Sequence, residues 1–205
     1  MTESGIIKED EIQEQTLQAA LQLFQAHGFR RVTMDDVARA IGKGRSSLYY
    51  YYKSKEEIFD AVMDAEISNM MTAIARAVDR AGTAEQKIFA FCATKLQVLR
   101  ERQAFYNTID LGMDAEEISN YNKAKYAIHR RVMQQEGVLL RQILTGGMDN
   151  GELAVMNKKE QDVSIFVLLS SLRGLKREMV IENDFSGIEP AVAALTRMVI
   201  HGLKK

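Results

Sequence analysis

The sequence is poor in the residues that interrupt or cross-link a chain. It has 205 residues with one proline, one cysteine and no tryptophan. Because proline breaks helices and strands, its near absence permits long uninterrupted elements. Cys92 has no partner within the chain, which excludes an intrachain disulfide framework and is typical of a reducing cytoplasm.

The sequence also lacks long apolar segments. The longest nearly apolar run, residues 165–172, includes two serines and is far shorter than the ~20 residues that cross a bilayer. Residues 1–14 carry five acidic side chains and no apolar core of a signal peptide. We therefore expect a cytoplasmic protein without membrane contact.

Helix-favouring residues dominate the rest of the chain. Hydrophobic residues make up 46% of it, enough for one sizeable core or two modest cores that share a helix. Abundant alanine, leucine, methionine, glutamate, lysine, arginine and glutamine favour helix over strand. The predicted fold class is all-α.

Capping residues and glycines predict where these helices begin and end. The predicted capping boxes are Thr33/Asp36, Ser54/Glu57, Thr83/Gln86, Asp114/Glu117 and Asn157/Glu160, and the predicted stops are Gly28, Gly42, Gly82, Gly112, Gly146–Gly147 and Gly151. The nine predicted helices cover residues 9–27, 33–41, 44–51, 54–81, 84–101, 103–111, 115–146, 158–182 and 189–203. The first three are short and the later ones are long enough for a bundle.

Charge is concentrated in one segment. The formal net charge is -1, yet residues 30–55 hold seven basic side chains against two acidic ones, a local balance of +5. Such a patch indicates a polyanion site, although a solvated charged face remains an equal alternative on charge alone.

The same segment has the spacing of a helix-turn-helix. Two short predicted helices flank Gly42, with Ala38 as a small residue at the crossing and Leu48 as an inward contact. On a helical wheel with Leu48 inward, the opposite side presents hydrogen-bond donors, which a helix in the major groove requires. These donors are Lys43, Ser46 and Tyr50, flanked by Ser47 and Tyr49.

Several of these residues form a familiar pattern. The run from Thr33 to Ala38, then Gly42, then the run Leu48-Tyr-Tyr-Tyr-Tyr-Lys-Ser-Lys55-Glu-Glu-Ile58-Phe59 resembles the N-terminal domain of the TetR family of regulators. Upstream, Ile12, Ala20, Phe24 and Gly28 occupy the positions of that family's first helix. The resemblance implies phosphate contacts from Thr33, Tyr49, Tyr51 and Lys55, and base contacts from Arg45 and Ser46.

Two positions depart from the family pattern. Lys43 replaces the usual small apolar residue and adds a potential DNA contact, whereas Tyr52 replaces the usual phenylalanine and is expected in the core. Alternatives stay open elsewhere, because Thr33 would cap its helix without DNA and Arg30 and Arg31 could be a solvated corner.

No enzyme motif stands out. The segment from Gly42 to Ser46 lacks the first glycine and the preceding strand of a phosphate loop. The three histidines fall on different predicted helices, and no zinc, nucleophile or redox motif occurs. We expect neither catalysis nor a metal or other cofactor.

The part after residue 53 is expected to bind a small effector and a second copy of the chain. Its middle helices hold residues able to line a mainly apolar pocket, although core packing explains each equally well: Phe89, Cys92, Phe105, Tyr106, Met113, Tyr126, His129 and Met133. The first of the last two long helices is apolar on more than one face, and with the final helix it is expected to form the interface of an isologous dimer. The expected dimer residues are Ser164, Leu168, Ser171, Leu172, Leu175, Leu195 and Val199.

These observations predict two domains. Residues 1–53 would form a helix-turn-helix DNA-binding domain, and residues 54–205 a helical ligand-binding and dimerisation domain. The predicted function is operator binding by a homodimeric transcriptional repressor that a small-molecule effector releases. The alternative is a helical carrier protein that does not bind DNA.

Overall fold

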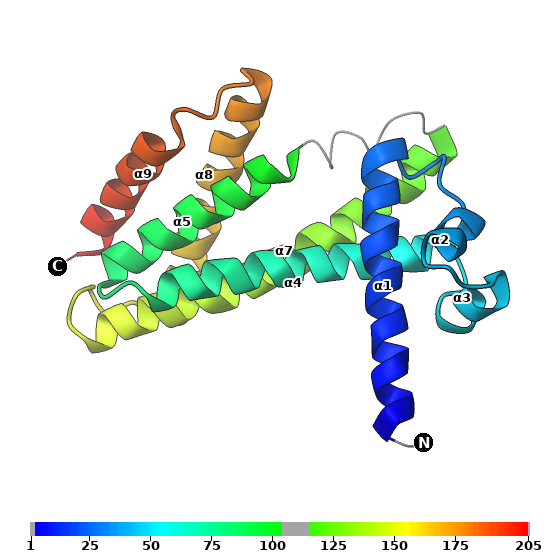
Figure 1. Ribbon diagram of the computed structural model, residues 1–205. Helices are drawn as coiled ribbons and strands as arrows, with labels where there is room; N and C mark the ends of the chain where they lie inside the picture. Colours follow the sequence, from blue (N-terminus) through cyan, green and yellow to red (C-terminus); the bar gives the residue numbers. More distant parts are fainter. Residues whose placement is uncertain (1–2, 104–114, 205) are drawn as a thin grey trace. The chain divides into compact units, whose positions relative to one another are not determined.

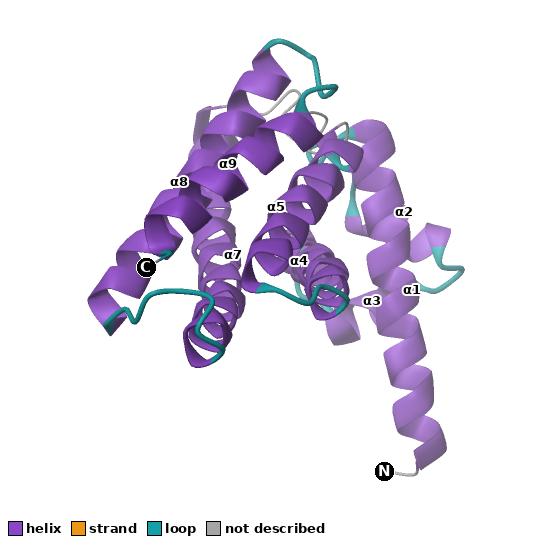
Figure 2. Cartoon of the chain, turned by 90° about the vertical axis from the view of Figure 1, so that its left-hand side faces the viewer, coloured by secondary structure: helices purple, strands orange, loops and turns teal. Residues whose placement is uncertain are grey.

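The computed structural model describes residues 3–103 and 115–204, with the side chains of residues 11–103 and 126–204. Within these ranges the regular secondary structure is entirely helical (Figures 1 and 2). The helices are α1 (Glu3–His27), α2 (Met34–Ala40), α3 (Arg45–Tyr51), α4 (Lys55–Asp79), α5 (Ala84–Glu101), α7 (Ala115–Asp149), α8 (Lys158–Ile181) and α9 (Ile188–Leu203). They confirm the all-α fold and eight predicted helices, while residues 104–111 of the ninth lie outside the described ranges. In the described part of the chain, no helix has both the length and the apolar character needed to cross a membrane.

Two predicted helix ends are wrong. Helix α1 begins at Glu3 and not at residue 9, since only Gly5 among the added residues disfavours helix. Helix α7 continues through Gly146 and Gly147 to Asp149. A Cβ on Gly147 would lie 2.9 Å from the Ala84 Cβ and 2.8 Å from Leu153 Cδ1, so glycine is needed there for close packing and not as a stop.

The chain forms two compact units, Met1–Ile67 with Arg102–Ile128, and Ser68–Glu101 with His129–Lys205. Helices α4 and α7 each contribute to both units. The predicted domain boundary after residue 53 stays a prediction.

The first unit has an aromatic core. The rings of Phe24, Phe29 and Phe59 pack together with centroid separations of 5.0–5.9 Å. Leu48 from α3 and Ile58 from α4 are fully buried in the same core. Each such side chain stabilises the fold by roughly 1.5–3 kcal/mol, and together they fix α3 against α1 and α4.

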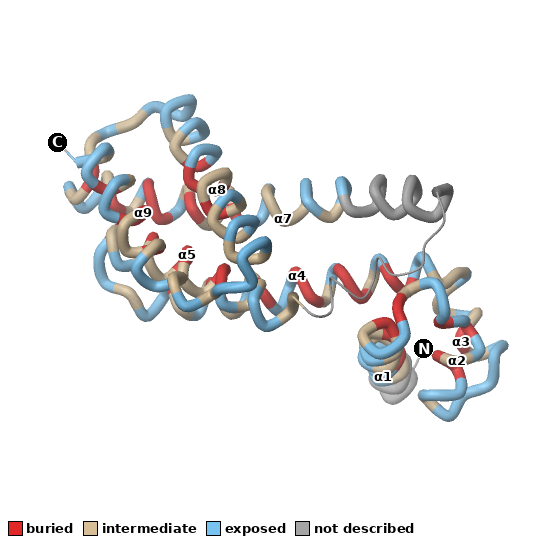
Figure 3. Tube along the Cα trace, turned by 90° about the horizontal axis from the view of Figure 1, so that it is seen from above, coloured by how far each residue is buried: buried red, intermediate tan, exposed pale blue. Residues whose placement is uncertain are grey.

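The second unit packs α5 against α8 and α9, together with the C-terminal halves of α4 and α7. Its core includes Ile74, Phe91, Leu140, Leu169 and Val192, one from each helix. Buried positions on α5, α8 and α9 face one another, while exposed positions lie on the outer sides (Figure 3).

Candidate nucleic-acid interface

The turn between α2 and α3 requires glycine at one position. The Lys43 N–H donates to the Ala38 carbonyl (3.0 Å) and the Gly42 N–H to the Arg39 carbonyl (3.1 Å), the two bonds of a Schellman motif. Gly42 has φ +63°, a conformation that strains any residue with a Cβ. With Ala38 and Leu48 buried at the crossing, the predicted helix-turn-helix geometry is confirmed.

The N-terminus of α2 carries a complete capping box. The Asp36 N–H donates to Thr33 Oγ1 (3.2 Å), and the Thr33 N–H donates to Asp36 Oδ2 (2.9 Å). The Thr33 hydroxyl also donates to Asp36 Oδ2 (2.7 Å), and this bond is the main cause of a lowered Asp36 pKa. Thr33 is exposed, so its hydroxyl lies at a surface where a phosphate could approach.

Helix α3 buries one side and exposes the other as the helical wheel predicts. Leu48 is fully buried, whereas Lys43, Arg45 and Ser46 are exposed at the N-terminal end. Tyr50 is 66% exposed and its ring packs edge-on against that of Tyr51. Ser47, Tyr49 and Tyr51 are half-buried along the flanks of this surface. The half-buried Tyr52 packs against the core, and burial raises the pKa of its hydroxyl.

Arg45 is held by two neighbours. Its Nε lies 3.0 Å from Asp35 Oδ1, so α3 is ion-paired to the first turn of α2. Its Nη2 donates to the Tyr49 hydroxyl (3.5 Å), and the guanidinium carbon lies 5.5 Å from the Tyr49 ring centroid. The bond to Tyr49 and then the charge of Asp35 raise the Arg45 pKa.

Lys55 ties the start of α4 to the turn that follows α1. Its Nζ donates to the carbonyls of Phe29 (3.0 Å) and Arg30 (3.4 Å) and lies 4.3 Å from the Phe29 ring centroid. These contacts give Lys55 a structural role that the sequence did not predict. Its predicted phosphate contact remains a prediction.

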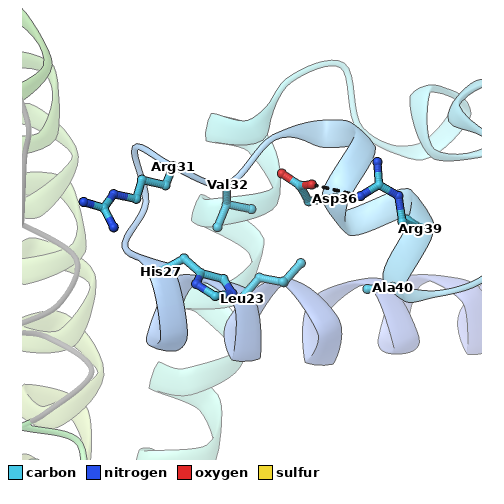
Figure 4. A pocket seen from close by; sticks show the side chains of 7 residues that line it. All are labelled: Leu23, His27, Arg31, Val32, Asp36, Arg39 and Ala40. Carbon is cyan, nitrogen blue, oxygen red and sulfur yellow. Dashed lines mark ion pairs between the residues drawn. The ribbon is translucent and has the colours of Figure 1, made fainter.

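An open groove of about 410 Å³ lies between α1 and α2 (Figure 4). Leu23, Val32 and Ala40 supply apolar walls, and the remaining lining residues are His27, Arg31, Asp36 and Arg39. Asp36 and Arg39 form an ion pair of 3.6 Å across one side, whereas Arg31 points away from the groove. Arg31 precedes the capped end of α2 and Arg39 lies in its last turn, so two arginines of the predicted basic patch border this groove.

The predicted effector residues are only partly brought together. Cys92 is buried in the core of the second unit, with Phe89 and Met133 half-buried against that core. Tyr126 is 64% exposed and His129 is also exposed. Phe105, Tyr106 and Met113 lie outside the described residues.

Sequence reasoning missed a buried ion pair beside these residues. Lys95 Nζ donates to Glu136 Oε2 at 2.7 Å, with side chains 7% and 0% exposed. Glu136 Oε1 has no hydrogen-bond partner among the described residues. Lys95 and Glu136 each interrupt an otherwise apolar helical face, and this interruption is visible in the sequence. Cys92 lies one helical turn from Lys95, and burial raises the pKa of the Cys92 thiol to about 12.

The predicted dimer residues divide between the core and its edge. Leu168, Leu172 and Leu195 are buried inside the second unit, whereas Ser164, Ser171, Leu175 and Val199 are half-buried. The large apolar side chains exposed along α8 and α9 are instead Val163, Phe166, Val167, Ile181 and Met198.

Comparisons with known proteins converge on the same segment. Residues 17–62 match the family model described as bacterial regulatory proteins, tetR family. The transcriptional regulator MftR of Mycobacterium tuberculosis is 54% identical over 39 residues, covering 19% of this chain and 20% of its own. The HTH-type transcriptional repressor ComR of Escherichia coli is 26% identical over 126 residues, covering 58% and 60%. This chain thus covers less than two thirds of each of these relatives.

A solved structure extends the likeness to nearly the whole fold. The transcriptional regulator FadR of Bacillus subtilis, in complex with stearoyl-CoA, has a TM-score of 0.67 with 14% identity, covering 93% of this chain and 98% of its own. At this identity the likeness concerns the fold alone: an N-terminal helix-turn-helix domain followed by a larger helical bundle. Residues 17–62, which fold into a helix-turn-helix with this geometry, thus match the tetR family of bacterial regulatory proteins.

Proposed function

We propose that this protein is a transcriptional regulator that binds operator DNA through α3. The observation that carries the proposal is the outward face of α3, where exposed donors stand on a helix held by a buried Leu48 and a Schellman turn. An α-helix with such donors at its N-terminal end fits the major groove and can reach base edges.

The donors divide into two roles. Arg45 and Ser46 at the start of α3 would contact bases, with Lys43 and Ser47 beside them. Tyr49, Tyr50 and Tyr51 would reach phosphates from α3, Thr33 from the cap of α2, and Lys55 from the start of α4. Contacts to phosphates fix the position of the helix, while those to bases select the sequence.

Selection of bound duplexes from random DNA tests this proposal. The selected duplex should bind more tightly than a scrambled one, and its affinity should fall steeply with salt because bound counterions are released. Arg45→Ala should weaken the selected duplex by about 1–3 kcal/mol and relax one base preference in each half-site. Salt-independent binding, or none, would reject DNA recognition by this surface.

We further propose that the protein acts as a homodimer through α8 and α9. Val163, Phe166 and Val167 share one side of α8 with the small residues Ser170 and Gly174, and such an exposed apolar stripe indicates an interaction site. A second copy is the occupant that a palindromic operator requires, because two recognition helices must lie about 34 Å apart.

The mass in solution tests the dimer. Phe166→Asp places a charge in the centre of the stripe and should convert the dimer into monomers, as measured by light scattering. Val155→Asp is the matched control, because Val155 is 81% exposed in the loop before α8 and should leave the mass unchanged. A dimer that survives Phe166→Asp uses another surface.

We propose that a largely apolar effector binds the helical unit and weakens operator binding. Cys92, Phe89 and Met133 lie at one core together with the Lys95–Glu136 pair, which would supply a polar anchor. Stearoyl-CoA, which FadR of Bacillus subtilis holds, is a suitable first probe. Operator affinity should fall with added effector by a coupling of typically ~1–3 kcal/mol, without loss of the dimer.

A further inference from the structure

The ion pair between Asp35 and Arg45 leaves one end of the guanidinium available. Asp35 Oδ1 lies 3.0 Å from Arg45 Nε, the nitrogen nearest the side-chain stem. The Tyr49 hydroxyl accepts a bond from Nη2 alone, and an arginine carries five N–H donors. At least three donors, all on Nη1 and Nη2, are thus not used by these two neighbours.

The remaining donors match one base edge. Guanine presents O6 and N7 side by side in the major groove, and arginine contacts both with its two terminal nitrogens. An arginine free to rotate would lose side-chain entropy when it makes this contact. Arg45 is already held from two sides by Asp35 and Tyr49, so part of this cost is met before DNA binds.

Helix capping does not account for Asp35. The capping box at the start of α2 uses Thr33 and Asp36, and Asp35 contributes no hydrogen bond to it. Asp35 is half exposed, with a side-chain accessibility of 49%, and its negative charge lies next to a surface proposed to approach phosphates. A favourable interaction with the helix dipole is available to any acid in this turn.

We propose that Asp35 is a positioning residue for base reading: it holds Arg45 Nε so that Nη1 and Nη2 face a guanine. This inference rests on the proposed DNA binding. The pair remains intact when Arg45 contacts guanine, but it must break for Arg45 to swing onto a phosphate. Asp35 therefore favours guanine contacts over phosphate contacts made without regard to sequence.

The test compares two affinities. The duplex selected by the wild type, and a copy with the guanine at the Arg45 position replaced by adenine, are titrated with wild type, Asp35→Ala and Asp35→Asn. Asp35→Ala should lower the preference for guanine by about two- to fivefold, the range expected for an exposed pair. Asp35→Asn keeps an acceptor for Nε but not the charge and should lie between.

Two controls separate positioning from charge. Glu56→Gln removes an acid from the first turn of α4 and should change both affinities by the same factor. In an Arg45→Ala background, Asp35→Ala should leave the ratio of the two affinities unchanged. Urea unfolding of each variant verifies that α2 stays folded.

Distinct results contradict the inference and the proposed function. If Asp35→Ala changes both affinities equally, or changes their ratio without Arg45, Asp35 does not position Arg45, although DNA binding stands. A selected site without guanine at this position also overturns the inference. If the wild type binds neither duplex, both proposals fall together.

Discussion

The helix-turn-helix and the core of the second unit each contain an ion pair, and the two pairs differ in their exposure to water. Asp35 and Arg45 have side chains 49% and 64% exposed, whereas Glu136 and Lys95 are 0% and 7% exposed. Water screens the first pair, so it contributes little to stability and its cation can take on an additional partner. The second pair has lost its hydration, so neither charge can be left alone without a large cost. The exposed pair is thus suited to DNA recognition, whereas the buried pair has a structural role because neither charge can lose its partner cheaply.

The largest test of this contrast removes one buried charge. Glu136→Leu leaves the Lys95 ammonium buried without its partner and should destabilise the protein by about 3–5 kcal/mol in urea unfolding. Adding Lys95→Met should recover most of this loss, because an apolar pair of similar volume needs no hydration. A single variant that costs less than about 1 kcal/mol would mean that water reaches the pair.

A smaller effect is expected at Gly147, where the second unit is tightly packed. Gly147→Ala inserts a methyl group 2.8–2.9 Å from Ala84 and Leu153 and should cost about 1–3 kcal/mol. Gly146→Ala is the matched control, since its Cβ meets nothing within 4 Å and the helix should gain about 0.5–1 kcal/mol. Equal effects of the two variants in thermal unfolding would show that the packing around Gly147 relaxes freely.

The smallest effect belongs to the exposed cap of α2. Thr33→Ala should cost about 1 kcal/mol at neutral pH, as is usual for a lost N-cap. The Asp36 pKa is lowered from 3.8 chiefly by its bond from Thr33, so the stabilisation by this carboxylate is present above pH 3.8 and is lost as the pH falls through the lowered value. The difference between wild type and Thr33→Ala should accordingly shrink in urea unfolding below pH 3.8. A constant difference across this range would assign the cap to the hydroxyl alone.

The sequence predicted most where local chemistry decides the structure. The capping boxes at Thr33 and Asn157, the turn at Gly42 and the inward Leu48 depend on neighbours within a few residues, and all are present. The same holds for the exposed side of α3.

Features that depend on distant residues could not be predicted. In the sequence Gly147 is typical of a helix stop, whereas in the structure it allows Ala84 and Leu153 to pack closely against the helix. The partner of Lys95 lies on another helix, and Lys55 contacts carbonyls 25 and 26 residues away. The Asp35–Arg45 pair likewise requires the angle between α2 and α3, which the hydrophobic pattern does not contain.

Because Cys92 is buried, chemical modification of its thiol would report when the core of the second unit opens. With its pKa raised to about 12, the thiol is almost entirely protonated at neutral pH and fully covered by the second core. Alkylating agents and oxidants attack the thiolate. Cys92 can therefore react only when this core opens and its sulfur is exposed to water. Each modified molecule therefore reports one such event. The rate of modification would follow the frequency of opening, and a ligand that closes the core would lengthen the interval between events.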